Sequence, residues 1–243
     1  MINILKYESS EISWCEITYN LSSYICEFFN SLSGFIYIYH SIKLYNDLKK
    51  LYGINFNFSD YEELRFFERK NLDIIIYSFL IGVFSIYFHG TLSYFGQILD
   101  EYSIYLLVMT LDIGKELTIS KKMLGLISMN IIPKYNRFGL FIYGFYKSLD
   151  LFKIFYYDRD EKRKKIFLFG NILFSLGFIT WIIDVFFCDS LIISIHWLWH
   201  IFSSCAFYYL SNYVILSHLE KYYQYNHPNY ELYLDYVFQS IPF

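Results

Sequence analysis

The sequence has little charge, and it lacks the short motifs that bind nucleotides. Charged residues make up 18% of the 243 positions, against roughly 25% in soluble domains. Neither a Walker loop nor a GxGxxG fingerprint is present. The net charge is −3, and no basic stretch interleaved with aromatic residues occurs. These absences give no reason to expect a nucleotide-binding enzyme or a nucleic-acid partner.

The N-terminus lacks the apolar core of a secretory signal. The first 30 residues carry Glu8, Glu11, Glu16 and Glu27, so we expect no cleaved signal peptide. The chain also shows no internal repeat, no low-complexity linker and no domain boundary. We therefore expect one domain that is preceded by an N-terminal segment, residues 1–30.

Apolar and aromatic residues are abundant, at 56% and 23% of the chain. The mean hydropathy of +0.30 is modest, because 27 tyrosines count against it although their rings suit membrane interfaces. Seven stretches have the character of spans of about 20 residues. Their ranges are 31–47, 73–95, 101–118, 123–137, 138–157, 166–188 and 191–217. This pattern predicts an all-α polytopic membrane protein, with a seven-transmembrane helix bundle over residues 31–217.

The third and fourth of these stretches are weaker than the rest. Charged residues interrupt the region between residues 112 and 122, and Pro133 ends the fourth stretch early. The alternative is a bundle of six spans, with this middle region lying partly at the membrane interface.

Lysine and arginine predict how the spans are oriented. With seven spans, successive loops alternate between the two sides of the membrane, and nearly all of the 20 Lys and Arg residues fall on one side. The other side carries only Lys6, Lys134 and Arg137. Because positively charged loops face the cytosol, the N-terminus is predicted to be lumenal. The tail, residues 218–243, is predicted to be cytosolic.

The last predicted span carries two histidines in the stretch "HWLWH", residues 196–200. Positions i and i+4 of a helix share one face, so His196 and His200 point the same way. The second span contributes Ser85 and His89 at the same spacing, and Asp100 follows. The predicted topology brings these five residues to one depth on the lumenal side. Ionisable groups inside a membrane are costly, and they mark functional sites.

Three imidazoles with an open fourth position are the ligand set of a catalytic zinc ion. Zinc makes a reactive water available at neutral pH and polarises a carbonyl oxygen. Asp100 is then a candidate to carry a proton from water to a leaving amine, and Ser85 to bond a developing oxyanion. These roles predict a hydrolase of acyl bonds that is not an ordinary zincin, because HExxH is absent. The alternative is a polar network satisfied among the helices.

These residues also carry a family resemblance. The pattern SxxxH, an Asp eleven residues later and HxxxH in the last span resembles the CREST superfamily of membrane hydrolases. The stretches "SWCEITYNLSSYICEFFNSLS", "YFHGTLSYFGQILDE" and "ITWIIDVFFCDSL" make the chain most similar to the alkaline ceramidases. Residues 102–165 match little.

The resemblance implies a reaction, a set of site residues and a location. The reaction is hydrolysis of the N-acyl amide of ceramide, which gives sphingosine and a fatty acid. Zinc is implied on the three histidines, with Ser85 and Asp100 as catalytic residues. A seven-helix bundle in the endoplasmic reticulum or Golgi is implied, with a lumenal N-terminus. The family's matching cysteines form a disulfide, which implies a bridge between Cys15 and Cys188.

A calcium-binding segment of the family matches Trp14, Glu16 and Glu27. Two positions depart from it, since Ser13 stands where the family typically has Asp and Thr18 where it has Asn. Calcium sites bind more tightly as ligand charge increases. We therefore expect this calcium site to be weakened or empty.

Two other functions stay open on the sequence. The first is a sister hydrolase of the superfamily, for example one that remodels the acyl chains of GPI anchors with the same zinc chemistry. The second is a seven-span receptor related to the adiponectin and progestin receptor group, which would hold zinc without turnover. That group leads us to expect a long cytosolic N-terminal domain or a reversed charge bias, and the chain shows neither. The expected partners are a ceramide-type lipid and the bilayer, with no protein partner.

Overall fold

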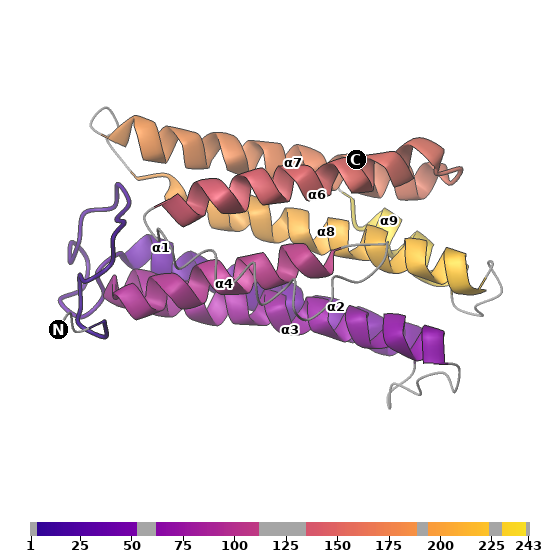
Figure 1. Cartoon of the computed structure of the whole chain (residues 1–243), viewed down its shortest axis with the longest axis horizontal. Helices are drawn as coiled ribbons and strands as arrows, with labels where there is room; N and C mark the ends of the chain where they lie inside the picture. The colour runs from indigo at the N-terminus through magenta and orange to yellow at the C-terminus, as the bar shows by residue number, and fades with distance from the viewer. Residues whose placement is uncertain (1–3, 53–61, 112–134, 189–193, 224–229, 242–243) are drawn as a thin grey trace.

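A computed structural model describes residues 4–52, 62–111, 135–188, 194–223 and 230–241, and every regular element in these ranges is a helix. The helices are α1 (Phe28–Ser33), α2 (Phe35–Tyr52), α3 (Glu62–Thr91), α4 (Tyr94–Thr110), α6 (Asn136–Tyr157), α7 (Glu161–Phe186), α8 (His196–Tyr223) and α9 (Tyr230–Gln239). The long helices lie side by side along the long axis of the molecule (Figure 1). The expected all-α class is therefore confirmed.

Each predicted span except 123–137 coincides with a long helix. That one span lies almost wholly outside the described residues, so the seven-span bundle stays a prediction. By length and composition alone, two of the described helical stretches are apolar enough to cross a membrane, Arg69–Thr91 and Glu161–Phe186. On the second of these, an apolar stripe at helical spacing is exposed, formed by Leu168, Ile172, Leu176 and Ile179. An exposed stripe of this kind suits contact with lipid.

Several helix boundaries differ from the predicted ones for identifiable reasons. The third predicted span began at residue 101, whereas α4 begins at Tyr94, because the Ser93 hydroxyl accepts a hydrogen bond from the Gly96 N–H at 3.1 Å and caps the helix. Asp100 therefore lies in the second turn of α4 instead of opening it. At the other end of the chain, α8 continues to Tyr223, and α9 packs against α7, α8 and α2.

The N-terminal segment, residues 4–27, covers one end of the bundle, where α3 ends and α4 and α8 begin (Figure 1). We call this the N-terminal end. Backbone N–H groups of the segment donate to the last carbonyls of α3: Glu8 to Thr91, Cys26 to Gly90 and Glu27 to His89, each at 3.0 Å. The final carbonyls of a helix have no partner within the helix. The segment therefore supplies the hydrogen-bond donors that the last carbonyl groups of α3 lack.

Glycines let two pairs of helices approach closely. A Cβ atom built on Gly82 of α3 would lie 2.9 Å from the carbonyl oxygen of Gly34 and 2.7 Å from Cγ1 of Ile38. On α7, a Cβ atom on Gly170 would lie 3.0 Å from Cγ of Leu210 on α8. Small residues at helix crossings are the usual device for close packing in membranes.

Polar side chains link α2 to α8 along the interior. The Tyr37 hydroxyl lies 2.6 Å from Ser203 Oγ, and the Tyr208 hydroxyl donates to Asp47 at 2.8 Å. Between these two contacts, His40 Nδ1 lies 2.8 Å from Ser204 Oγ. These bonds fix the register of α8, which carries two of the candidate metal ligands.

We predict that Gly82→Ala destabilises the protein by about 1–3 kcal/mol, the usual cost of overpacking. The new methyl group meets backbone atoms of Gly34 and Ile38, which cannot rotate away. Gly90→Ala on the same helix is the control, because its Cβ atom would meet only Ser31 Oγ at 3.6 Å. Thermal unfolding in detergent compares the two variants, and equal midpoints would contradict the prediction.

Candidate metal centre

Three buried histidines meet at the N-terminal end of the bundle. His89 lies in the last turn of α3, and His196 and His200 lie in the first two turns of α8. Their exposed fractions are 1%, 2% and 4%. One ligand atom from each residue lies within 4.8 Å of the others, a spacing that could hold a metal ion. The predicted convergence of the three imidazoles is thus present in the structure.

Hydrogen bonds turn two of the three rings toward the centre of the cluster. His89 Nδ1 lies 2.6 Å from a carboxylate oxygen of Glu27, which only accepts, so this nitrogen carries the proton. His200 Nδ1 lies 3.2 Å from the carbonyl oxygen of Asn30 and 2.7 Å from Ser33 Oγ. Both rings therefore keep the lone pair of Nε2 for a metal, which is how metal-binding histidines are usually oriented.

Of the five residues predicted to form the zinc site, three carry a buried polar atom without a hydrogen-bond partner: Ser85 Oγ, Asp100 Oδ1 and His196 Nδ1. Buried polar groups are nearly always bonded, so these atoms point to a bound group. All three residues line one cavity of about 120 Å³. The donor set therefore fits a metal ion together with a water or a substrate atom. The described side chains around the cluster do not form the fully satisfied polar network that was the alternative.

The rest of the cavity is apolar, and it extends from the histidines into the bundle. Helices α2, α3, α4, α6, α7 and α8 all contribute to its wall, and Ile12 and Trp14 of the N-terminal segment close it. A mostly apolar pocket with a few convergent polar groups is typical of a binding site.

The residues of the expected calcium segment lie at the N-terminus of α1. Glu16 accepts from the N–H groups of Phe29 and Asn30 at 2.6 and 2.8 Å. Glu27 accepts from the Trp14 N–H at 3.0 Å and from the Asn30 side chain at 2.9 Å. The two carboxylates thus converge on Asn30. Burial raises the pKa of the Glu16 carboxyl above its ordinary value, and the two backbone donors offset only part of this rise.

Two residues of that segment also contact the histidines. The ring of Trp14 stacks on His196 at 3.6 Å between centroids, and Glu27 bonds His89. The other expected ligands, Ser13 and Thr18, are exposed. The sequence did not indicate the bond between Glu27 and His89, because no helical or strand spacing relates residues 62 positions apart.

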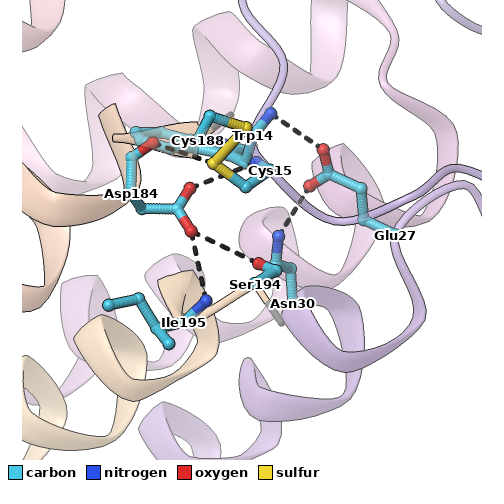
Figure 2. The surroundings of a disulfide bond; sticks show 8 residues. All are labelled: Trp14, Cys15, Glu27, Asn30, Asp184, Cys188, Ser194 and Ile195. Carbon is cyan, nitrogen blue, oxygen red and sulfur yellow. Dashed lines mark hydrogen bonds between the residues drawn. A yellow bond between two sulfur atoms is a disulfide. The ribbon is translucent and has the colours of Figure 1, made fainter. Parts of the chain in front are cut away.

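A disulfide joins Cys15 to Cys188, as the family resemblance implied (Figure 2). Beside it lies the buried carboxylate of Asp184, near the end of α7. Asp184 accepts from the N–H of Cys15 at 3.2 Å and from the N–H of Ile195 at 3.2 Å. Ile195 directly precedes His196. One carboxylate therefore holds both the N-terminal segment and the start of α8.

Fold and site together define an all-helical protein with a buried three-histidine cluster at the head of an apolar cavity. A sequence model of the family described as Ceramidase matches residues 6–243. The chain belongs to this family, and the resemblance stated from its motifs is confirmed.

The relatives are alkaline ceramidases from animals, an amoeba and yeast. Alkaline ceramidase 1 of Mus musculus is 36% identical over 104 residues, which cover 43% of this chain and 34% of that protein. Putative alkaline ceramidase dcd3A of Dictyostelium discoideum is 23% identical over 252 residues, which cover 87% of this chain and 88% of that protein. Alkaline ceramidase YPC1 of Saccharomyces cerevisiae is 25% identical over 258 residues, with 87% and 77% covered. The match to the mouse protein thus spans about a third of its length. These findings favour neither the GPI-remodelling nor the receptor alternative.

We predict that replacing Cys15 and Cys188 together by Ser destabilises the protein by about 2–5 kcal/mol, the usual range for a native disulfide. The bridge closes a long loop and keeps the N-terminal segment over the histidines. Unfolding is measured with and without a reductant, which should shift the wild type and leave the double variant unchanged. Cys205→Ser, at a free cysteine, is the control. A peptide map of protein from native membranes with both thiols free would contradict the bridge.

Proposed function

We propose that the protein is a zinc-dependent amidase that hydrolyses the N-acyl bond of ceramides inside the membrane to give sphingosine and a free fatty acid. The observation that carries the proposal is the placement of three clustered imidazoles, two of them oriented by hydrogen bonds, beside unbonded Ser85 and Asp100 atoms. The apolar cavity that leads away from them suits a hydrocarbon chain of a lipid. Membership of the ceramidase family supplies the substrate class.

His89, His196 and His200 would hold the zinc. When bound, zinc supplies a Lewis acid and a water of lowered pKa. Asp100 accepts the proton of the attacking water and passes it to the amide nitrogen, so the leaving group departs as a neutral amine. The Ser85 hydroxyl donates a hydrogen bond to the acyl oxygen as negative charge develops there. A bond forms between the water oxygen and the acyl carbon, and the C–N bond breaks.

The residues around the three histidines hold their rings in position and shield them from water. Glu27 holds the proton of His89 on Nδ1, and the Asn30 carbonyl does the same for His200. Trp14 covers His196 with its ring. Exclusion of water strengthens each charge interaction in the site.

We also propose a location in the endoplasmic reticulum or Golgi membrane, with the N-terminal end of the bundle facing the lumen. The charge bias of the loops supports this orientation. A disulfide at that end is consistent with an oxidising compartment.

His200→Ala should lose both zinc and ceramide hydrolysis, because two imidazoles rarely hold catalytic zinc. Asp100→Asn should instead keep the zinc and lose about 100-fold or more in rate, since only proton transfer is affected. Metal is measured by elemental analysis on folded, detergent-purified protein, and products by mass spectrometry on a panel of ceramides with and without a zinc chelator.

His218→Ala is the control for metal loss. It lies on the same helix α8, about 27 Å from His200 along the axis, and it should keep its zinc. Full zinc occupancy in His200→Ala would overturn the ligand assignment. A wild type that retains zinc yet hydrolyses no ceramide in the panel would overturn the proposed reaction.

Calcium should bind weakly or not at all, and activity should depend little on it. Glu16 and Glu27 supply two carboxylates, but both already accept hydrogen bonds from protein donors, and Ser13 lacks the charge of an acid. After removal of calcium with a selective chelator, calcium is titrated against activity and thermal stability. Ser13→Asp should strengthen binding. A sharp submicromolar requirement in the wild type would contradict this prediction.

A further inference from the structure

Two glycines of α6 have no close neighbour within the described part of the chain. A Cβ atom on Gly170 or Gly177 of α7 would press against α8, at 3.0 Å from Leu210 Cγ and 3.1 Å from Phe202 Cβ. Among the residues that the structure describes, a Cβ atom on Gly139 or Gly144 of α6 would meet nothing within 4 Å. Glycine inside a helix is destabilising relative to alanine. Its presence without close contact therefore calls for another explanation.

Only one of these two α6 glycines borders the cavity. Gly144 is part of the cavity wall, whereas Gly139 is exposed and lies outside it. The two positions offer the same freedom for a larger side chain, yet such a side chain would enter the cavity from position 144 alone. Comparing the two positions therefore tests whether the glycine at 144 serves the cavity or whether α6 simply tolerates glycine.

The depth of Gly144 in the cavity follows from the register of α6 against α4. The side chain of Asn136 donates to Glu101 at 2.8 Å, and the rings of Tyr143 and Tyr105 lie 5.0 Å apart. Both helices therefore run away from the N-terminal end at matching levels (Figure 1). Gly144, eight residues beyond Asn136, lies about 12 Å deeper. This is the level of Val108, which also lines the cavity.

Aromatic rings of α2, α7 and α8 that pack on one another form another part of the cavity wall. Phe207 packs against Phe174 and Tyr37 with centroids 6.3 Å apart in each pair, and Phe174 packs against Trp199 at 5.9 Å. These rings support one another and leave little room to withdraw. A side chain added at position 144 would therefore fill the cavity rather than displace the opposite wall.

We propose that Gly144 determines the chain length of the lipid that the site accepts, by leaving open the deep part of the cavity for one hydrocarbon chain of the substrate. This inference rests on the proposed function, in that the scissile amide is placed at the histidines. A chain that starts there and follows the helices passes Gly144, which lies about 12 Å deeper than Asn136. The absence of a side chain at this level keeps the path open.

The test compares Gly144→Phe with Gly139→Phe. Ceramides with one sphingoid base and either a short or a long N-acyl chain are hydrolysed in parallel, and a second series varies the base instead. In Gly144→Phe, the ratio of kcat/KM for long over short chains should fall about ten-fold or more in one series, which identifies the chain that lies there. Gly139→Phe should keep the wild-type ratio in both series. An unchanged ratio in Gly144→Phe, or an equal fall in both variants, would overturn the proposal.

A binding measurement separates this proposal from the proposed reaction. Free fatty acids of increasing length are added to the purified protein, and the thermal midpoint is recorded. The added stabilisation should grow with length in the wild type and in Gly139→Phe, and level off at a shorter length in Gly144→Phe. This holds even if the wild type fails to hydrolyse ceramide. Gly144→Leu serves where the Phe variant does not fold, and the same length dependence in every variant would overturn the role of Gly144.

Discussion

Three imidazole rings buried at the head of an apolar cavity can share one metal only if each ring turns a lone pair inward. The bonds that enforce this condition organise the surrounding structure. Glu27 fixes the proton of His89, and the Asn30 carbonyl fixes that of His200. Both partners lie in or beside α1, and not in the helices that carry the histidines. The short helix α1 and the segment before it are therefore part of the candidate metal centre.

The same segment connects the metal centre to the disulfide. Cys15 is tied to the end of α7 by its bridge to Cys188, and its N–H bonds Asp184, whose other oxygen accepts from Ile195 at the start of α8. Asp184 is 2% exposed, and a buried carboxylate is tolerated only when it is bonded on several sides. Its bonds connect the end of α7 to the N-terminal segment and to Ile195, the residue before His196. Asp184 therefore positions both the disulfide bridge and the start of the helix that carries His196.

Helical periodicity and topology were sufficient to predict the ligand cluster, because SxxxH and HxxxH place side chains on one face and alternating spans bring the faces together. They also located every long helix that the structure describes, with boundary errors such as the start of α4, where the Ser93 cap was missed. The bond between Glu27 and His89 was beyond reach. It joins an irregular segment to a helix end, and neither has a periodic pattern that relates the two. For the same reason, no pattern in the sequence indicated that Trp14 covers His196.

The cavity combines a wall that is tightly constrained with one that is not. On the α7 and α8 side, glycines bring backbones together and aromatic rings interlock, so a change there would disturb the helix that carries His196 and His200. Among the described helices, α6 packs chiefly on α4 and contributes no metal ligand. Substitutions on α6 can therefore change the shape of the apolar cavity while the ligands stay in place.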